Sequence, residues 1–202
     1  MKPDELFFVF RLIRTLYGAN AARAAKIFYV MSGSALIPME KILEANPDVW
    51  FQAYIDSDRA VIEGLTERAW AAGVRNLVIT VDVPVPGKQP AFGVQLSDQA
   101  KWAIIARYVS HPRWLFGTLL RTLISSGMPH LENTGRKRGL PMISANAPKR
   151  SQVHAALNWD DFNWLRQRWQ GKLLIKGVLS AEDTAIAGKI GLDGIFVSNH
   201  GG

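Results

Sequence analysis

Reactive side chains follow the buried, strand-like stretches of this sequence, at the point where each stretch ends. They are Gln52 and Tyr54, Thr80 and Asp82, Lys176, and Ser198, Asn199 and His200. One polar residue at a strand end is typical of a side chain that hydrogen-bonds to a neighbouring loop. Four stretches that place imidazole, carboxylate, amine and amide groups at the same end instead indicate an active site, because such groups transfer protons and bind polar ligands.

The segment "GIFVSNHGG", residues 194–202, carries one of these groups. An apolar run of strand type leads into His200, so the sequence predicts a buried strand that delivers a histidine to the site. The other histidines, His111, His130 and His154, have no such context. We expect them in loops or on the surface.

Five stretches rich in β-forming residues alternate with helical patterns, which predicts parallel βαβ units. The stretches span residues 26–32, 49–55, 76–82, 172–178 and 193–200. This alternation suits a doubly wound sheet or a (β/α)8 barrel. No GxGxxG motif follows an early strand, and the reactive groups gather at the carboxyl ends. The sequence therefore favours an α/β fold of the (β/α)8 type, with about five of the eight units present.

Capping residues mark the helices between these strands. Pro38 can open a helix that runs through Ala45. Ser57 or Asp58 can cap the next helix, which Gly73 ends. The last two predicted helices begin at the caps Asn158 and Ser180.

Two regions depart from this alternation. Residues 1–25 are predicted to form an N-terminal amphipathic helix, since charged residues interrupt its apolar patch and exclude a transmembrane span or signal peptide. Within the barrel region, 26–202, a long insertion covers about 83–158 and contains helical patterns at 98–110 and 111–124. The stretch 127–150 is rich in Gly, Pro and Asn, which predicts an exposed loop.

The composition excludes several classes of protein. The 202 residues contain no cysteine, so neither a disulfide framework nor a cysteine metal site is expected, and we predict no metal. The net charge of +7 comes from scattered residues, densest at 136–138 and 149–150, without a nucleic-acid-binding motif. We therefore predict no nucleic-acid partner. We expect a cytoplasmic or membrane-associated protein, because no export signal is evident.

The motifs, taken together, resemble the FMN-dependent 2-hydroxy-acid dehydrogenases and oxidases, the family of L-lactate dehydrogenase and glycolate oxidase. The matching stretches are "YVMSGSALIPMEKI", "WFQAYI", "VITVDVPVPGK" and residues 158–202. The combination of IKG with SNHGG is highly specific, and TVD with PxxGK adds to it. The resemblance implies an FMN cofactor at the top of a (β/α)8 barrel and oxidation of a small L-2-hydroxy acid to a 2-oxo acid.

The resemblance also implies a role for each site residue. Ser32, Gln52 and Thr80 match positions that contact the flavin ring. Lys176 matches the lysine whose charge stabilises the reduced flavin. His200 matches the catalytic base, Asp82 the carboxylate that stabilises its imidazolium, and Tyr54 a residue that hydrogen-bonds the substrate. Ser198 is expected to contact FMN or to position His200.

The implied partners are a 2-hydroxy acid and an electron acceptor that is quinone, cytochrome or oxygen. A homo-oligomer is compatible with the sequence. Exposed aromatic residues of the insertion, Trp102, Trp114 and Phe116, are candidates for contact with a membrane or partner, while packing against the barrel is the alternative.

The chain also departs from the family pattern. The family continues after SNHGG with an arginine that clamps the substrate carboxylate and with loops that bind the FMN phosphate, and we expect a truncated member that lacks them. Gln89 stands where a substrate-facing arginine is common, and Ser34 where some members have an aromatic residue. The alternative functions are therefore an inactive fragment of such an enzyme, or another flavin- or phosphate-binding barrel such as an isomerase or nitronate oxidase.

Overall fold

The computed structural model describes residues 15–55, 58–82, 110–141 and 157–200 of the chain. Among these, five strands form one parallel sheet in the order β1-β2-β3-β4-β5. The strands are β1 (Val30–Ser32), β2 (Trp50–Ala53), β3 (Asn76–Thr80), β4 (Lys172–Lys176) and β5 (Gly194–Phe196). This sequential order is that of consecutive units of a (β/α)8 barrel, since a doubly wound sheet reverses its order at a switch point. The predicted fold class is confirmed.

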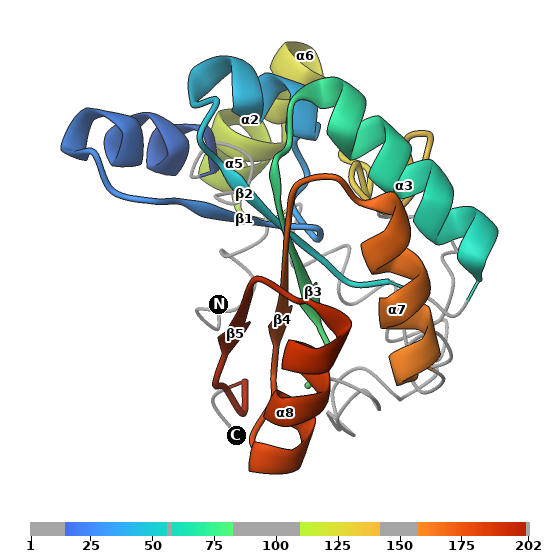
Figure 1. The fold of residues 1–202 in the computed structure, drawn as a ribbon. Coiled ribbons are helices and arrows are strands. Elements are labelled where there is room, and N and C mark those ends of the chain that lie inside the picture. Colours follow the sequence, from blue (N-terminus) through green and yellow to red (C-terminus); the bar gives the residue numbers. More distant parts are fainter. Residues whose placement is uncertain (1–14, 56–57, 83–109, 142–156, 201–202) are drawn as a thin grey trace.

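The helices between the strands cover one side of the sheet. They are α2 (Met39–Ala45), α3 (Arg59–Ala72), α7 (Trp159–Arg168) and α8 (Ala181–Ile190). In Figure 1, α3, α7 and α8 lie along the same side of the strands. Right-handed βαβ crossovers produce this arrangement whenever each strand is added to the same edge of the sheet.

Alternation along the strands gives the sheet two different faces. On the helix side, Phe51, Leu77 and Ile175 are fully buried and join one core with helix residues such as Ile42 and Leu165. The other side carries Gln52, Thr80 and Lys176. Apolar burial thus fixes the register of the strands, and the register turns the polar residues toward the inside of the barrel.

The predicted helix caps are confirmed. The Asp58 side chain accepts from the N–H of Ala60, and Asn158 forms a complete capping box with Asp161. Ser180 accepts from the N–H of Asp183. Gly73 and Gly191 end α3 and α8 in the left-handed conformation that glycine adopts easily.

The strands are shorter than the sequence predicts. β1 begins at Val30 and not at Lys26, because Ile27 and Phe28 are exposed and lie before the paired segment. β5 ends at Phe196, so His200 lies in the loop that follows the strand. Residues of β-forming type indicate a strand, but they do not show where its partner stops pairing.

The N-terminal segment and the insertion are partly described. A helix covers residues 15–25, in agreement with the expected N-terminal helix, and residues 1–14 are outside the described part. In the insertion, α5 (Pro112–Trp114), a π-helical turn (Leu115–Leu120) and α6 (Arg121–Ser126) form one helical rod. The helix expected at 98–110 lies, up to residue 109, outside the described residues.

The segment 127–141 corrects one expectation. It forms a loop as predicted, but Glu132 and Asn133 are buried and not exposed. Asn133 bonds to backbone groups of residues 35–39, and the Glu132 carbonyl accepts from Arg68 of α3. These partners are far away in sequence, so loop composition alone does not reveal the burial. Among the helices of the described ranges, none is both long and apolar enough to cross a bilayer.

Candidate active site

A cavity of about 430 Å³ opens at the carboxyl ends of the strands. Its lining comes from all five strands and the loops that follow them: Val30, Ser32, Gln52, Tyr54, Val78, Thr80, Lys176, Phe196, Ser198 and His200. Ligand sites of (β/α)8 barrels form at this end of the sheet, because the loops after the strands converge there.

Asp82 joins the two basic residues of the cavity. Its Oδ2 lies 2.6 Å from Lys176 Nζ, and its Oδ1 lies 2.7 Å from His200 Nδ1. Lys176 Nζ and His200 Nδ1 are 3.2 Å apart. The Asp82 side chain is only 6% exposed, whereas His200 is 42% exposed. A buried carboxylate therefore holds an accessible imidazole and an amine in fixed positions.

The electrostatics of this cluster favour an ionised aspartate. Burial raises the pKa of Asp82, but the hydrogen bonds from Lys176 and His200, together with their charges, outweigh burial and hold that pKa below its ordinary value. Since the carboxylate only accepts, the imidazole must donate from Nδ1 to Asp82. The Nε2 atom of His200 is then the nitrogen that can accept a proton.

A second polar pair lies on the neighbouring strands. Gln52 Nε2 donates to Thr80 Oγ1 at 2.7 Å, and both side chains are buried. The backbone carbonyl of Gln52 also accepts from the N–H of Gly33, at 2.6 Å. This bond ties the loop after β1, which begins at Gly33, to the end of β2.

Backbone conformation positions the Asp82 cluster. Gly177 follows β4 with φ of +106°, and a Cβ atom built there would lie 2.4 Å from the Cβ of Asp82. Only glycine permits both this φ and this approach. His200 also has a positive φ, of 62°, and its N–H donates to Ser198 Oγ at 3.0 Å. Ser198 thereby stabilises a backbone conformation that is uncommon for residues other than glycine.

The structure brings together all eight predicted site residues. Ser32, Gln52, Tyr54, Thr80, Lys176, Ser198 and His200 line the cavity, and Asp82 contacts two of them. The roles assigned to them remain predictions. Sequence reasoning missed the apolar lining of Val30, Val78 and Phe196, although strand alternation places them on the same face as Gln52 and Thr80.

Two of the remaining histidines, His111 and His130, do not line this cavity. His111 is exposed, and His130 Nδ1 is 2.6 Å from the carbonyl oxygen of Met128. His154 and Gln89 are outside the described residues. In the part of the chain that the structure describes, no three His, Asp or Glu side chains are grouped as metal ligands.

Comparison with known proteins places this geometry in a family context. A family model described as "FMN-dependent dehydrogenase" matches residues 14–202. An L-lactate dehydrogenase of Pseudomonas putida is 37% identical over 190 residues, which cover 91% of this chain and 49% of that protein. An L-lactate dehydrogenase of Vibrio cholerae is 35% identical over 196 residues, with the same coverage. The chain thus spans about half the length of these curated relatives.

Solved structures give the same picture. The crystal structure of the monotopic membrane protein (S)-mandelate dehydrogenase superimposes with a TM-score of 0.63 at 30% identity, covering 91% of this chain and 50% of that one. A mandelate oxidase solved with (S)-4-hydroxymandelic acid gives a TM-score of 0.62 at 26% identity, covering 93% of this chain and 47% of that one.

Proposed function

Because the chain belongs to the FMN-dependent dehydrogenase family, we propose that residues 26–202 carry part of an active site that oxidises a small L-2-hydroxy acid to the 2-oxo acid. The observation that carries this proposal is the contact of Asp82 with both Lys176 and His200 beside the cavity. The relatives named above act, by their names, on lactate and mandelate, which are both 2-hydroxy acids.

The cavity suits a flavin. Its volume of about 430 Å³ is within the range of small-molecule sites, and its polar lining combines one cation with amide and hydroxyl groups. Ser32, Gln52, Thr80, Lys176 and Ser198 are the side chains that would hold FMN. When bound, FMN supplies the acceptor for the two electrons that leave the substrate. The ammonium group of Lys176 stabilises negative charge that develops next to it.

His200 is the proton acceptor in this proposal. Its Nδ1–H donates to Asp82, so the free electron pair of Nε2 takes the proton from the substrate. The Lys176 ammonium, 3.2 Å from Nδ1, opposes the positive charge that His200 then acquires. The Asp82 carboxylate contacts both cations and offsets this repulsion. Tyr54, which also lines the cavity, would hydrogen-bond the substrate.

Flavin bleaching tests the proposal directly. The 202-residue chain is mixed with FMN without oxygen, and the visible absorption of the bound flavin is followed after addition of L-lactate, with D-lactate as the matched control. We expect bleaching by the L-isomer alone, and none in His200→Ala although that variant still binds FMN. Flavin that binds to the wild-type chain but is not reduced would instead support the inactive alternative.

We also infer that the helical rod over 112–126 contacts a membrane surface. Phe116, Leu120 and Ile124, spaced four residues apart, are 63%, 43% and 79% exposed. Residues 110–126 include Arg113 and Arg121 but no acidic residue. An exposed apolar stripe beside basic side chains favours an anionic lipid surface, and one relative is a monotopic membrane protein. Trp102 and the Trp114 side chain are outside the described part.

Vesicle flotation tests this contact. We expect the chain to float with vesicles that contain anionic phosphatidylglycerol, and to float less with pure phosphatidylcholine. Replacing Phe116 and Ile124 by Ser should abolish flotation, whereas Val61→Ser, at an exposed apolar residue of α3, should not. Equal flotation of both variants would refute the assignment.

A further inference from the structure

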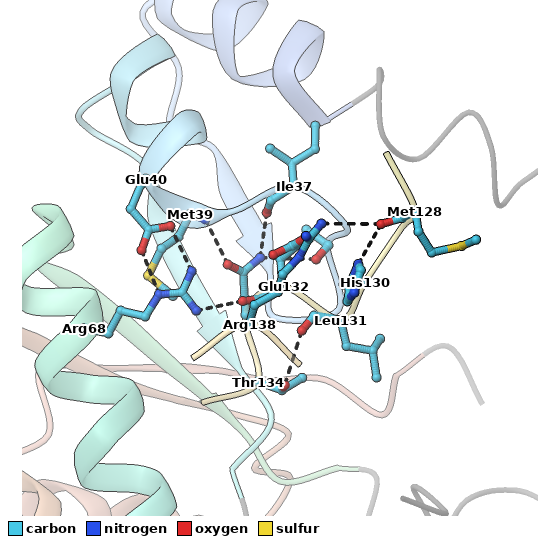
Figure 2. Close-up of polar contacts among 12 residues, drawn as sticks. Ile37, Met39, Glu40, Arg68, Met128, His130, Leu131, Glu132, Thr134 and Arg138 are labelled. Atoms are coloured by element: carbon cyan, nitrogen blue, oxygen red, sulfur yellow. Dashed lines mark hydrogen bonds and ion pairs between the residues drawn. The ribbon is translucent and has the colours of Figure 1, made fainter. Parts of the chain in front are cut away.

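The buried part of the insertion is held by polar contacts between residues that are 64 to 98 positions apart in the sequence. Figure 2 shows residues of the segment 128–138 beside Ile37, Met39, Glu40 and Arg68. The side chain of Asn133 lies at the centre of these contacts and is only 2% exposed. A buried amide that is not satisfied would be costly, so its partners reveal what it holds.

The Asn133 side chain bonds to three backbone groups, two in the loop before α2 and one at the start of α2. Its Oδ1 accepts from the N–H of Met39 at 2.9 Å, and its Nδ2 donates to the carbonyls of Ala35 and Ile37 at 3.2 and 2.8 Å. Met39 begins α2, and the preceding Pro38 forms no side-chain cap. Asn133 therefore supplies, from 94 residues away, the cap that the local sequence does not provide.

The loop that Asn133 holds directly follows Ser32, the last residue of β1, and Ser32 lines the cavity. The N–H of Ser34 donates to Ser32 Oγ at 3.2 Å, and the N–H of Ala35 donates to the Ser32 carbonyl at 2.8 Å. The orientation of Ser32 thus depends on the backbone conformation of residues 33–37, and two carbonyls of this segment accept hydrogen bonds from Asn133.

A separate ion-pair network fixes the segment that carries Asn133. Arg68 of α3 forms a bidentate pair with Glu40 of α2, at 2.7 and 2.9 Å, and donates to the carbonyl of Glu132 at 2.7 Å. The buried carboxylate of Glu132 is paired with Arg138 at 2.7 Å. These contacts attach the segment 127–141 to α2 and α3, and they restrain the backbone that carries Asn133.

From these contacts we propose that Asn133 is a positioning residue, which holds the loop 33–38 and through it Ser32 beside the cavity. The inference rests on the proposed function, because it names what keeps Ser32 in place beside the cofactor. It also assigns a role to the insertion between β3 and α7, because its residue Asn133 holds the loop that follows Ser32.

Two variants separate the parts of this role. Asn133→Asp keeps the size of the side chain and an acceptor for Met39, but replaces the amide that donates to the two carbonyls. Asn133→Ala removes all three bonds. The control is Asp193→Ala at the opposite end of the sheet, where Asp193 accepts from the N–H of Leu173 and pairs with Arg166 and Lys172. It lowers stability without touching the loop.

Hydrogen exchange and FMN titration are the readouts, both measured well below the unfolding midpoint of every variant. Amide exchange is followed in the peptide over 33–39, and FMN affinity by quenching of flavin fluorescence. We expect both Asn133 variants to exchange this peptide about tenfold faster and to bind FMN about tenfold more weakly than the wild type. Asp193→Ala should leave both values within about twofold of the wild type.

Each result decides a separate claim. Unchanged exchange in the 33–39 peptide of Asn133→Asp would overturn the positioning role. Equal loss of FMN affinity in Asp193→Ala and the Asn133 variants would also overturn it, because the effect would then be one of stability alone. A wild-type chain that binds no FMN would refute the proposed function, while the exchange measurement, which needs no flavin, would still decide whether Asn133 holds the loop.

Discussion

Replacement of Gly177 by alanine tests whether Asp82 is fixed by a close backbone approach. The new Cβ would lie 2.4 Å from the Asp82 Cβ and 2.8 Å from the Asp82 nitrogen, closer than carbon atoms pack. Gly177 also has a φ of +106°, which strains any residue with a side chain. Asp82 must therefore shift, and its bonds to Lys176 and His200 must lengthen.

Two other glycines of this chain separate the causes. Gly73 has nearly the same φ, +108°, but nothing lies within 4 Å of an added Cβ. Gly73→Ala should therefore cost only the backbone strain, roughly 1–2 kcal/mol. Gly177→Ala adds steric overlap of about 1–3 kcal/mol, for a total of about 2–5 kcal/mol. Gly188→Ala, in the exposed interior of α8, should stabilise the protein by about 0.5–1 kcal/mol.

Urea unfolding of the three variants and the wild type measures these free energies, with the slope checked for constancy. FMN titration of the same proteins should show weaker binding for Gly177→Ala alone. If Gly177→Ala lowers the free energy of unfolding no more than Gly73→Ala does, the close approach to Asp82 does not contribute to stability and the reasoning is refuted.

Three further perturbations have defined outcomes. The folded state lowers the pKa of Asp82, so this carboxylate adds stability at pH values above its ordinary pKa and loses that contribution as the pH falls through the lowered value. Asp82→Asn should therefore destabilise the protein at pH 7 but not in strong acid, as measured by urea unfolding at both pH values. Asn158→Ala removes the capping box of α7 and should cost about 1 kcal/mol in the same assay. Arg68→Ala, which loses a bidentate pair and a carbonyl bond, should cost about 2–3 kcal/mol, and a loss below 0.5 kcal/mol would show that the network is incidental.

The sequence predicts those features that depend on residues close together in the chain. The side chains of Asp58, Asn158 and Ser180 cap their helices by accepting from backbone N–H groups two or three residues later. Each capping pattern and its contact therefore lie within four consecutive residues. The convergence of Gln52 and Lys176 was also predictable, because parallel strands of one sheet place their carboxyl ends together.

Contacts between distant segments could not be predicted in the same way. Glu132 and Asn133 lie in a stretch with the composition of an exposed loop, and contacts with α3 and with residues 35–39 hold them in the interior. The direct bond between Asp82 and Lys176 depends on the path of the chain around Gly177, which strand periodicity does not describe. The start of β1 likewise depends on where pairing with β2 begins, which is at Val30 opposite Trp50.

The sequential order of the strands has a consequence for how the chain folds. Three of the four ladders join residues close in sequence: Val30 pairs with Trp50, Phe51 with Leu77, and Leu174 with Gly194. The fourth pairs Asn76 with Lys172, 96 positions later.

Closing that long loop costs about 1 kcal/mol more conformational entropy than closing the loop between β2 and β3. Topologies with more distant contacts fold more slowly. The N-terminal units and the β4–α8–β5 unit can therefore form early and independently. The pairing of β3 with β4 joins these two parts and also brings Asp82 to Lys176. We expect this pairing to be the slow step of folding, so that the cavity forms last.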